Sequence, residues 1–331
     1  MNRDPMHPFT NTILRWFSEN GRELPWRMTR DPYAIWLSEI ILQQTRIVQG
    51  LPYWQRFMQR WPTVETLAAA SEDEVLREWQ GLGYYSRARN LHMAAKQISE
   101  AGGFPTTMQG LKSLKGVGDY TAAAIGSIAF DLPAAVVDGN VYRVLARHFG
   151  IDTPINSTKG KKEFTALAER MLPADKASAY NQAVMDFGAL QCTPSNPQCA
   201  CCPLTETCVA LRTNTVDKLP VKERKLKIKE RHFSYVYIRC NRQTTLHRRP
   251  SGDIWQGLYE PWLTESVPSG AIMLKQGVRH VLTHQVLYAD FWLWEPDERP
   301  LLPDGYFWID EAAIDDYGVP RLVEMLIQLI R

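Results

Sequence analysis

The sequence predicts a multidomain protein, with an all-α region followed by a smaller α+β domain. Up to about residue 190, apolar residues recur at helical spacing in one segment after another, without the alternation that marks strands. A tight cluster of cysteines follows, and from about His232 short strand-like runs alternate with turns rich in Pro and Gly. We therefore expect an all-α catalytic region at 1–212, a linker at 213–231 and an α+β domain at 232–331.

The composition describes an ordinary globular chain of 331 residues, 45% hydrophobic and 22% charged, with a net charge of +2. So small a net charge excludes a protein that is basic throughout, and any nucleic-acid surface has to come from local clustering. The sequence has no apolar run of about eighteen residues and no secretory leader, so we expect a cytoplasmic protein with no membrane contact.

The chain begins with a predicted helix at 9–20 that ends at Gly21. A second, strongly apolar helix is predicted from Ala34 to Gln44 (AIWLSEIILQQ), and Glu39 lies on its apolar stripe. Apolar surroundings destabilise the charged form of a carboxylate and raise its pKa, which makes Glu39 a candidate general acid. The alternative is a partly exposed glutamate that pairs with a neighbouring arginine.

Two segments further along have compositions suited to DNA. The segment 81–90 (GLGYYSRARN) places two tyrosines beside two arginines after a glycine turn, and such side chains stack on bases and bind phosphate. Between residues 218 and 231 the predicted linker carries seven Lys or Arg against two Glu. This charge is typical of an exposed linker that lies along DNA, and the alternative is a solvated charged loop.

Two helix starts mark the segment from Leu114 to Arg147. A Gly-Val-Gly turn at Gly116–Gly118 opens an Ala-rich helix, and the amides at such a start favour a phosphate. Asp138, at a Gly-Asn turn, opens the next helix. The alternatives are that the glycines only join two helices and that the aspartate only caps one.

Four of the six cysteines form the pattern C-x6-C-x2-C-x5-C, at Cys192, Cys199, Cys202 and Cys208. Thiols at this density in a cytoplasmic protein are typical of metal ligands rather than of disulfides. Zinc and a [4Fe-4S] cluster both take four thiolates, and the spacing does not separate them. Cys201 is an alternative to its neighbour Cys202, but the six-two-five spacing uses Cys202.

Together these motifs resemble the helix-hairpin-helix (endonuclease III-like) DNA glycosylase superfamily, and most closely its A/G-specific adenine DNA glycosylase (MutY) family. The resemblance rests on LPWR (24–27), WLSEIILQQT (36–45), GLGYYSRARN (81–90), LKGVGDYTAAAI (114–125), VVDGNVYRVLAR (136–147) and the four-cysteine loop. It implies a base-excision-repair enzyme with a six-helix barrel and a [4Fe-4S] cluster. Such an enzyme removes adenine paired with 8-oxoguanine or guanine in double-stranded DNA, which prevents G:C to T:A transversions. We expect a nucleoid-associated monomer.

The resemblance also implies catalytic roles. Glu39 would protonate the adenine and Asp138 would stabilise the oxocarbenium ion, the division of labour that glycosidases make between two carboxylates. Asn140 would assist Asp138. Tyr120 stands where endonuclease III-like relatives carry a Schiff-base lysine, so we expect a monofunctional enzyme in which Tyr120 positions the sugar or the water. The alternative for Tyr120 is helix packing.

Further roles are implied for the pocket, the duplex and the cluster. The adenine pocket is expected to contain Trp26, Arg27 and Gln182. The four cysteines of the pattern would hold the [4Fe-4S] cluster. The expected DNA-binding residues are Gln43, Gln44, Thr45, Leu82, Tyr84, Arg87, Gly116, Val117, Gly118, Leu282, Thr283 and His284.

The C-terminal domain resembles the Nudix (MutT) fold, which in this family recognises 8-oxoguanine. The sequence after residue 232 contains no Nudix metal box, which supports recognition without hydrolysis. The loop that usually reads Phe-Ser-His is Leu282-Thr283-His284 here, so polar contacts remain possible while aromatic stacking is lost. The preference for 8-oxoguanine over guanine is therefore open.

Two other functions fit parts of the sequence. One is a pyrimidine glycosylase with lyase activity, which shares the hairpin and the cluster; Tyr120 and the additional C-terminal domain count against it. The other is a catalytically silent mismatch-binding protein, and the pair Glu39 and Asp138 argues against that.

Overall fold

The structure is a computed structural model that describes residues 6–223 and 228–331. The described residues form two compact units. The first contains the chain up to Gln43 and from Gln97 to Glu223, and the second contains Gln44–Lys96 and the chain from Ile228 onward. The predicted region 1–212 is thus divided between the units. No helix among the described residues is long and apolar enough to cross a membrane.

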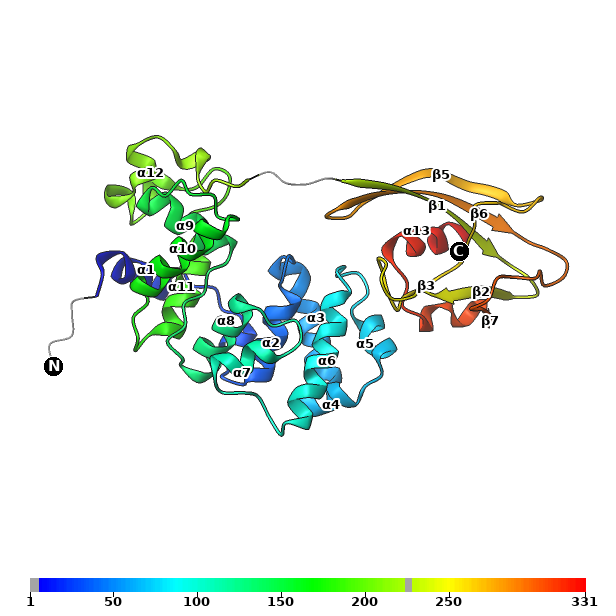
Figure 1. Ribbon diagram of the computed structural model, residues 1–331, viewed down its shortest axis with the longest axis horizontal. Coiled ribbons are helices and arrows are strands. Elements are labelled where there is room, and N and C mark those ends of the chain that lie inside the picture. Colours follow the sequence, from blue (N-terminus) through cyan, green and yellow to red (C-terminus); the bar gives the residue numbers. More distant parts are fainter. Residues whose placement is uncertain (1–5, 224–227) are drawn as a thin grey trace. The chain divides into compact units, whose positions relative to one another are not determined.

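The first unit is helical, as the apolar periodicity predicted (Figure 1). The side chain of Trp16 on its first helix packs edge-on against Phe187, with 5.0 Å between ring centroids, in a core that also contains Ile13. Its helices are α1 (Pro8–Asn20), η1 (Pro25–Arg27), α2 (Pro32–Ile41), α7 (Met108–Ser113), α8 (Asp119–Phe130), α9 (Gly139–Phe149), α10 (Thr158–Met171), α11 (Ala177–Leu190), η2 (Cys199–Cys201), η3 (Thr205–Thr207), α12 (Val209–Arg212) and η4 (Val216–Lys218).

Local sequence explains where the site-bearing helices start and stop. The side chain of Asp31 caps α2, which begins at Pro32 and ends at Ile41, three residues before the predicted end. Helix α8 begins after Gly118, and α9 ends at Phe149, just before Gly150, whose φ of 69° suits glycine. The small residues of α8 allow Ile35 of α2 to pack closely against it.

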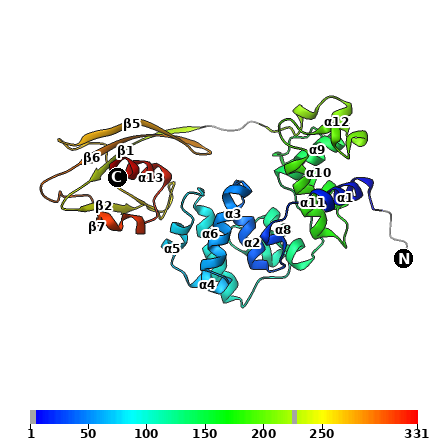
Figure 2. The same ribbon diagram turned by 180° about the vertical axis from the view of Figure 1, so that it is seen from behind.

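The second unit joins helices to the α+β domain. Strands β4, β1, β6 and β5 form one sheet in that order, with β1 and β6 parallel, and β3, β2 and β7 form another. Helix α13 lies between the two sheets and contributes Leu322 and Leu326 to their common core (Figure 2). Its elements are α3 (Ile47–Arg60), α4 (Val64–Ala69), α5 (Glu72–Glu78), α6 (Ser86–Glu100, the end of which belongs to the first unit), β1 (Lys229–Ile238), β2 (Gln243–Arg248), β3 (Tyr259–Glu260), β4 (Trp262–Leu263), β5 (Ile272–Val281), β6 (Gln285–Trp294), β7 (Tyr306–Asp310), η5 (Glu311–Asp316) and α13 (Arg321–Ile330).

Polar contacts explain why 44–96 groups with the α+β domain. Arg248 of β2 forms an ion pair with Asp73 of α5 at 2.8 Å, and Arg89 of α6 donates to the carbonyl oxygen of Gln256 at 2.7 Å. The sequence offered no local signal for these contacts, because they join positions more than a hundred residues apart.

The segment predicted as a linker at 213–231 is shorter in the structure. Leu219 belongs to the core of the first unit, and the amide of Ile155 donates to the carbonyl of Val221 at 3.0 Å. At the other end, β1 already begins at Lys229, where its amide donates to the carbonyl oxygen of His284. Residues 224–227, which carry three of the predicted basic side chains, lie outside the described residues.

Candidate active site and cysteine cluster

Glu39 lies on α2 between buried apolar neighbours, as its place on the stripe predicted. Burial raises the pKa of its carboxyl from 4.5 to about 7, although a hydrogen bond from Tyr120 lowers it; the charge of Asp138 raises it further. The hydroxyl of Tyr120 donates to Oε2 of Glu39 at 2.7 Å. The carboxyl is therefore set to exchange a proton near neutral pH.

Asp138 is the N-cap residue of α9. Its carboxylate accepts from the amide of Val141 at 2.8 Å and from Nδ2 of Asn140 at 2.8 Å. The capping alternative is thus correct, and the charge of the same carboxylate acts on Glu39 by raising its pKa. The surroundings of Asp138 are polar but also buried. Burial raises the pKa of Asp138 more than these hydrogen bonds lower it.

Tyr120 remains a hydrogen-bond donor. Burial raises the pKa of its phenol well above 10, and the charges of Glu39 and Asp138 raise it further. Its hydroxyl also lies 3.7 Å from the sulfur of Met185. Position 120 therefore carries a neutral phenol that donates a hydrogen bond to the carboxyl of Glu39.

Arg143 of α9 was missed by the sequence analysis. Its Nη2 donates to Oδ1 of Asn140 at 2.8 Å and to the carbonyl of Gly188 at 2.6 Å, while Nε donates to the carbonyl of Cys192 at 2.7 Å. A Cβ on Gly188 would lie 2.6 Å from Cβ of Asn140, so only glycine allows this approach. The helical spacing between Asn140 and Arg143 was the available signal.

Of the predicted pocket residues, Arg27 contacts Asp186, whose side chain is fully buried. Burial works against its charge, but hydrogen bonds from Arg27 and Arg22 lower the pKa of Asp186 to about 2. Arg27 uses both terminal nitrogens, at 2.7 and 2.8 Å. Arg27 and Gln182 line one open cleft, whereas Trp26 is buried beside them and neither Glu39 nor Asp138 lines it.

The hairpin differs in detail from expectation. Gly116 adopts a φ of 77°, whereas Gly118 has an ordinary φ of −92° and caps α8. Val117 is buried and anchors the turn, and no heavy atom lies within 4 Å of a Cβ built on Gly118. No side chain caps the start of α8, so its first amides have no partner from the N-cap residue, as a helix start that binds an anion requires.

The predicted duplex contacts are divided between the units. In the first, Nε2 of Gln43 donates to Oγ1 of Thr121 at 3.3 Å. In the second, Gln44 and Tyr84 have positive φ values of 56° and 48°, and Tyr84 is 47% exposed. The hydroxyl groups of Tyr84 and Thr283 lie 2.6 Å apart, so two predicted contacts meet.

The other residues of this set have different surroundings. Leu82 is buried, and Leu282 packs partly against the domain core. His284 is exposed in the turn that joins β5 to β6, where it is free to contact a ligand. The guanidinium of Arg87 is directed into the loop structure rather than outward, because neighbouring carbonyls and rings surround it; a direct phosphate grip does not fit that position.

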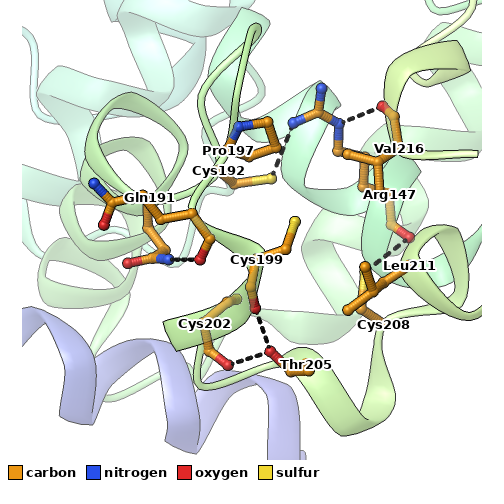
Figure 3. A pocket seen from close by; sticks show the side chains of 11 residues that line it. Arg147, Gln191, Cys192, Pro197, Cys199, Cys202, Thr205, Cys208, Leu211 and Val216 are labelled. Carbon is orange, nitrogen blue, oxygen red and sulfur yellow. Dashed lines mark hydrogen bonds between the residues drawn. The ribbon is translucent and has the colours of Figure 1, made fainter.

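The four cysteines of the predicted pattern line one small cavity of about 30 Å³ (Figure 3). Nη1 of Arg147 lies 3.5 Å from the sulfur of Cys192, and the amide of Leu204 lies 3.4 Å from that of Cys202. Cys201 is exposed and does not line the cavity, which agrees with the choice of Cys202. Within 6–223 and 228–331, no three His, Cys, Asp or Glu side chains converge on the position of a single ion.

Comparison with protein families gives two matches. Residues 37–173 match the HhH-GPD superfamily base excision DNA repair protein, and residues 234–329 match the NUDIX domain. The adenine DNA glycosylase of Buchnera aphidicola subsp. Schizaphis graminum is 37% identical over 98% of this chain and 99% of its own. That of Homo sapiens is 42% identical over 61% of this chain and 39% of its own.

Among solved structures, a thermostable thymine-DNA glycosylase is 32% identical, covers 62% of this chain and 95% of its own, and has a TM-score of 0.58. A non-covalent endonuclease III–DNA complex has a TM-score of 0.54 over the same share at 22% identity. At that identity the second likeness bears on the fold alone, and the fold is the predicted helical one.

Proposed function

Since this chain belongs to the adenine DNA glycosylase family of the HhH-GPD superfamily, we propose that it removes adenine paired with 8-oxoguanine or guanine. It is an adenine DNA glycosylase of base excision repair, a hydrolase that acts on N-glycosyl bonds. One observation carries the assignment of roles: the hydroxyl of Tyr120 donates to the carboxyl of Glu39, whose pKa burial raises to about 7.

The reaction needs the adenine outside the base stack, because its glycosidic bond is out of reach inside the duplex. Glu39 then gives its proton to a ring nitrogen of adenine as the bond from C1′ breaks and its electron pair leaves with the base. Asp138 stabilises the positive charge on the sugar. Water adds its oxygen to C1′, and its proton passes to a carboxylate, which leaves an intact strand with an abasic site.

Tyr120 supports hydrolysis without strand cleavage. Lyase activity needs an amine that forms a Schiff base with the sugar, and a phenol with a pKa well above 10 supplies none. In this role Tyr120 holds the carboxyl of Glu39 through its 2.7 Å hydrogen bond. We therefore propose a monofunctional enzyme.

The cysteine cavity fits a [4Fe-4S] cluster held by Cys192, Cys199, Cys202 and Cys208. Four thiols line one cavity, and a guanidinium and an amide approach two of the sulfurs, as the negative charge of such a cluster favours. When bound, the cluster would crosslink the 192–208 loop through iron–thiolate bonds. Arg147 ties the same loop to α9 through the carbonyl of Thr193 at 2.7 Å.

Replacing Cys202 with serine is expected to reduce bound iron and sulfide and to lower the melting temperature, because the loop loses one of its four anchors. Cys201→Ser is the matched control: it makes the same change on the adjacent residue, which lies outside the cavity, and should keep full iron content. Iron and sulfide analysis of the purified variants provides the measurement. Equal iron content in the two variants would exclude Cys202 as a ligand.

We further propose that the C-terminal domain reads the base opposite the adenine. The loop that contains Thr283 reaches Tyr84, which is exposed and held in a left-handed conformation. An exposed ring of this kind is suited to insertion between bases. Leu282 provides no aromatic stacking, so recognition of 8-oxoguanine would depend on Thr283, His284 and Tyr84.

Single-turnover assays with and without alkali test the function. The duplexes contain adenine opposite 8-oxoguanine, adenine opposite guanine, thymine opposite guanine, or an oxidised pyrimidine. We expect free adenine from the first two and strand breaks only after alkali. Cleavage of the pyrimidine duplex without alkali would establish a lyase instead, and binding without base release would establish a silent binder. Release of thymine would instead indicate the activity of the 32% identical relative, a thymine-DNA glycosylase.

A further inference from the structure

Arg87, in the first turn of α6, lies beneath two loops that carry predicted duplex contacts. Its side chain reaches the 42–46 loop through Oγ1 of Thr45, 3.4 Å from Nη2. The same nitrogen lies 3.4 Å from the carbonyl oxygen of Leu82 and 3.3 Å from that of Gly83, both in the 81–85 loop. One nearly buried guanidinium thus connects the two loops.

The 81–85 loop is held in an unusual conformation around this guanidinium. Gly81, Gly83 and Tyr84 all have positive φ values, and a left-handed conformation is unfavourable for a residue with a side chain. The indole of Trp79 donates to the carbonyl of Gly83 at 3.0 Å, the same oxygen that Arg87 approaches. Such a conformation persists only where several contacts enforce it.

Ring contacts complete the arrangement. The guanidinium carbon of Arg87 lies 5.1 Å from the ring centroid of Trp79 and 5.6 Å from that of Tyr84. A planar group with several donors can serve two carbonyls, a hydroxyl and two rings at once, and a lysine ammonium cannot reproduce that geometry. Arg87 therefore holds the backbone and the ring of Tyr84 in place while the ring remains exposed.

We propose that Arg87 is a positioning residue that fixes the 81–85 loop against the 42–46 loop, so that Tyr84 and Thr45 meet the mispair in one geometry. Arg87 does not touch the substrate in this role and acts through Tyr84. The inference rests on the proposed function, because it concerns how the duplex is opened around the mispaired adenine.

A double-mutant cycle with Arg87→Met and Tyr84→Ala tests this coupling. We expect Arg87→Met to lower the single-turnover rate on the adenine–8-oxoguanine duplex about tenfold when Tyr84 is present, and by less than about twofold in the Tyr84→Ala background. A purely structural role for Arg87 would lower the rate by the same factor in both backgrounds, and that result would overturn the proposal. Arg87→Lys keeps the charge and serves as the second variant if Arg87→Met unfolds; the same cycle applies to it.

Arg89→Met is the matched control, because it removes an arginine of the same helix that donates to Gln256 and not to the 81–85 loop. Its effect should combine additively with that of Tyr84→Ala. Dissociation constants for an intact mismatch duplex, measured for the same proteins, give a second double-mutant cycle that does not depend on base release. If the wild type releases no adenine, the proposed function fails. Separately, this inference is refuted if the effects of the Arg87 and Tyr84 substitutions on the free energy of duplex binding are additive.

Discussion

Replacing Glu39 with glutamine is expected to lower the single-turnover rate of adenine release by about 10³-fold, within the range that general acid catalysis contributes. Glutamine has nearly the same shape and can still accept the hydrogen bond from Tyr120, but it carries no acidic proton. Glu19→Gln, on the exposed side of α1 in the same unit, is the matched control and should leave the rate unchanged. A Glu39→Gln enzyme that keeps more than about a tenth of the wild-type rate would be incompatible with its role as the acid.

The pH dependence of the wild type provides a second test of Glu39. The protonated form donates, so with a pKa of about 7 the rate should be highest below pH 7 and decline above it. At lower pH, protonation of Asp138 should reduce the rate again, because only its anion stabilises the sugar cation. The declines in rate at high and at low pH reflect the titration of two interacting carboxyl groups, Glu39 and Asp138, as a pair. A rate that does not decline above pH 7 would contradict the proton-donor role.

Asp138→Asn is expected to lower the rate about 10² to 10³-fold while the protein stays folded. Asparagine is as good an N-cap residue as aspartate, so its side-chain oxygen can still accept from the amide of Val141 and support α9. The negative charge is lost, together with the hydrogen bond that Oδ2 of Asp138 accepts from Nδ2 of Asn140. The melting temperature should therefore stay within about 4 °C of the wild type, as measured by differential scanning calorimetry beside the kinetic assay.

Asp131→Asn is the matched control for that substitution. Asp131 is the C-cap residue of α8, has a φ of 53° that asparagine tolerates, and its side chain is 63% exposed. The same chemical change there should affect neither the rate nor the folding. If Asp138→Asn retained wild-type activity, or if it lost activity only together with its structure, the carboxylate would have no electrostatic role.

Local patterns were enough to predict the helical region, the inward position of Glu39 and the helix start at Asp138. The apolar spacing around Glu39 predicted an inward carboxylate, because one periodicity determines both the helix and the face it buries. The Gly-Asn turn predicted that Asp138 starts a helix. The six-two-five spacing selected Cys202 over Cys201, and the cavity includes the former and not the latter.

Other features depend on contacts that no local pattern contains. Asp186 meets Arg27 across 159 residues of sequence, and the loop of Cys192 meets Arg147 across 45. The composition of 81–90 predicted that Arg87 binds phosphate. The sequence alone does not distinguish an arginine that faces solvent from one that contacts backbone carbonyls, as Arg87 does. The grouping of 44–96 with the α+β domain likewise arises from tertiary contacts.

The raised pKa of Glu39 has a consequence for selection on this chain. Because the folded protein holds this proton more tightly than the unfolded chain, stability falls as pH rises from 4.5 to about 7, at a cost on the order of 3 kcal/mol. That is a large fraction of the 5–15 kcal/mol that holds a typical domain folded. Selection for cellular abundance alone would favour glutamine at position 39, and only selection against mutation of the genome would favour glutamate.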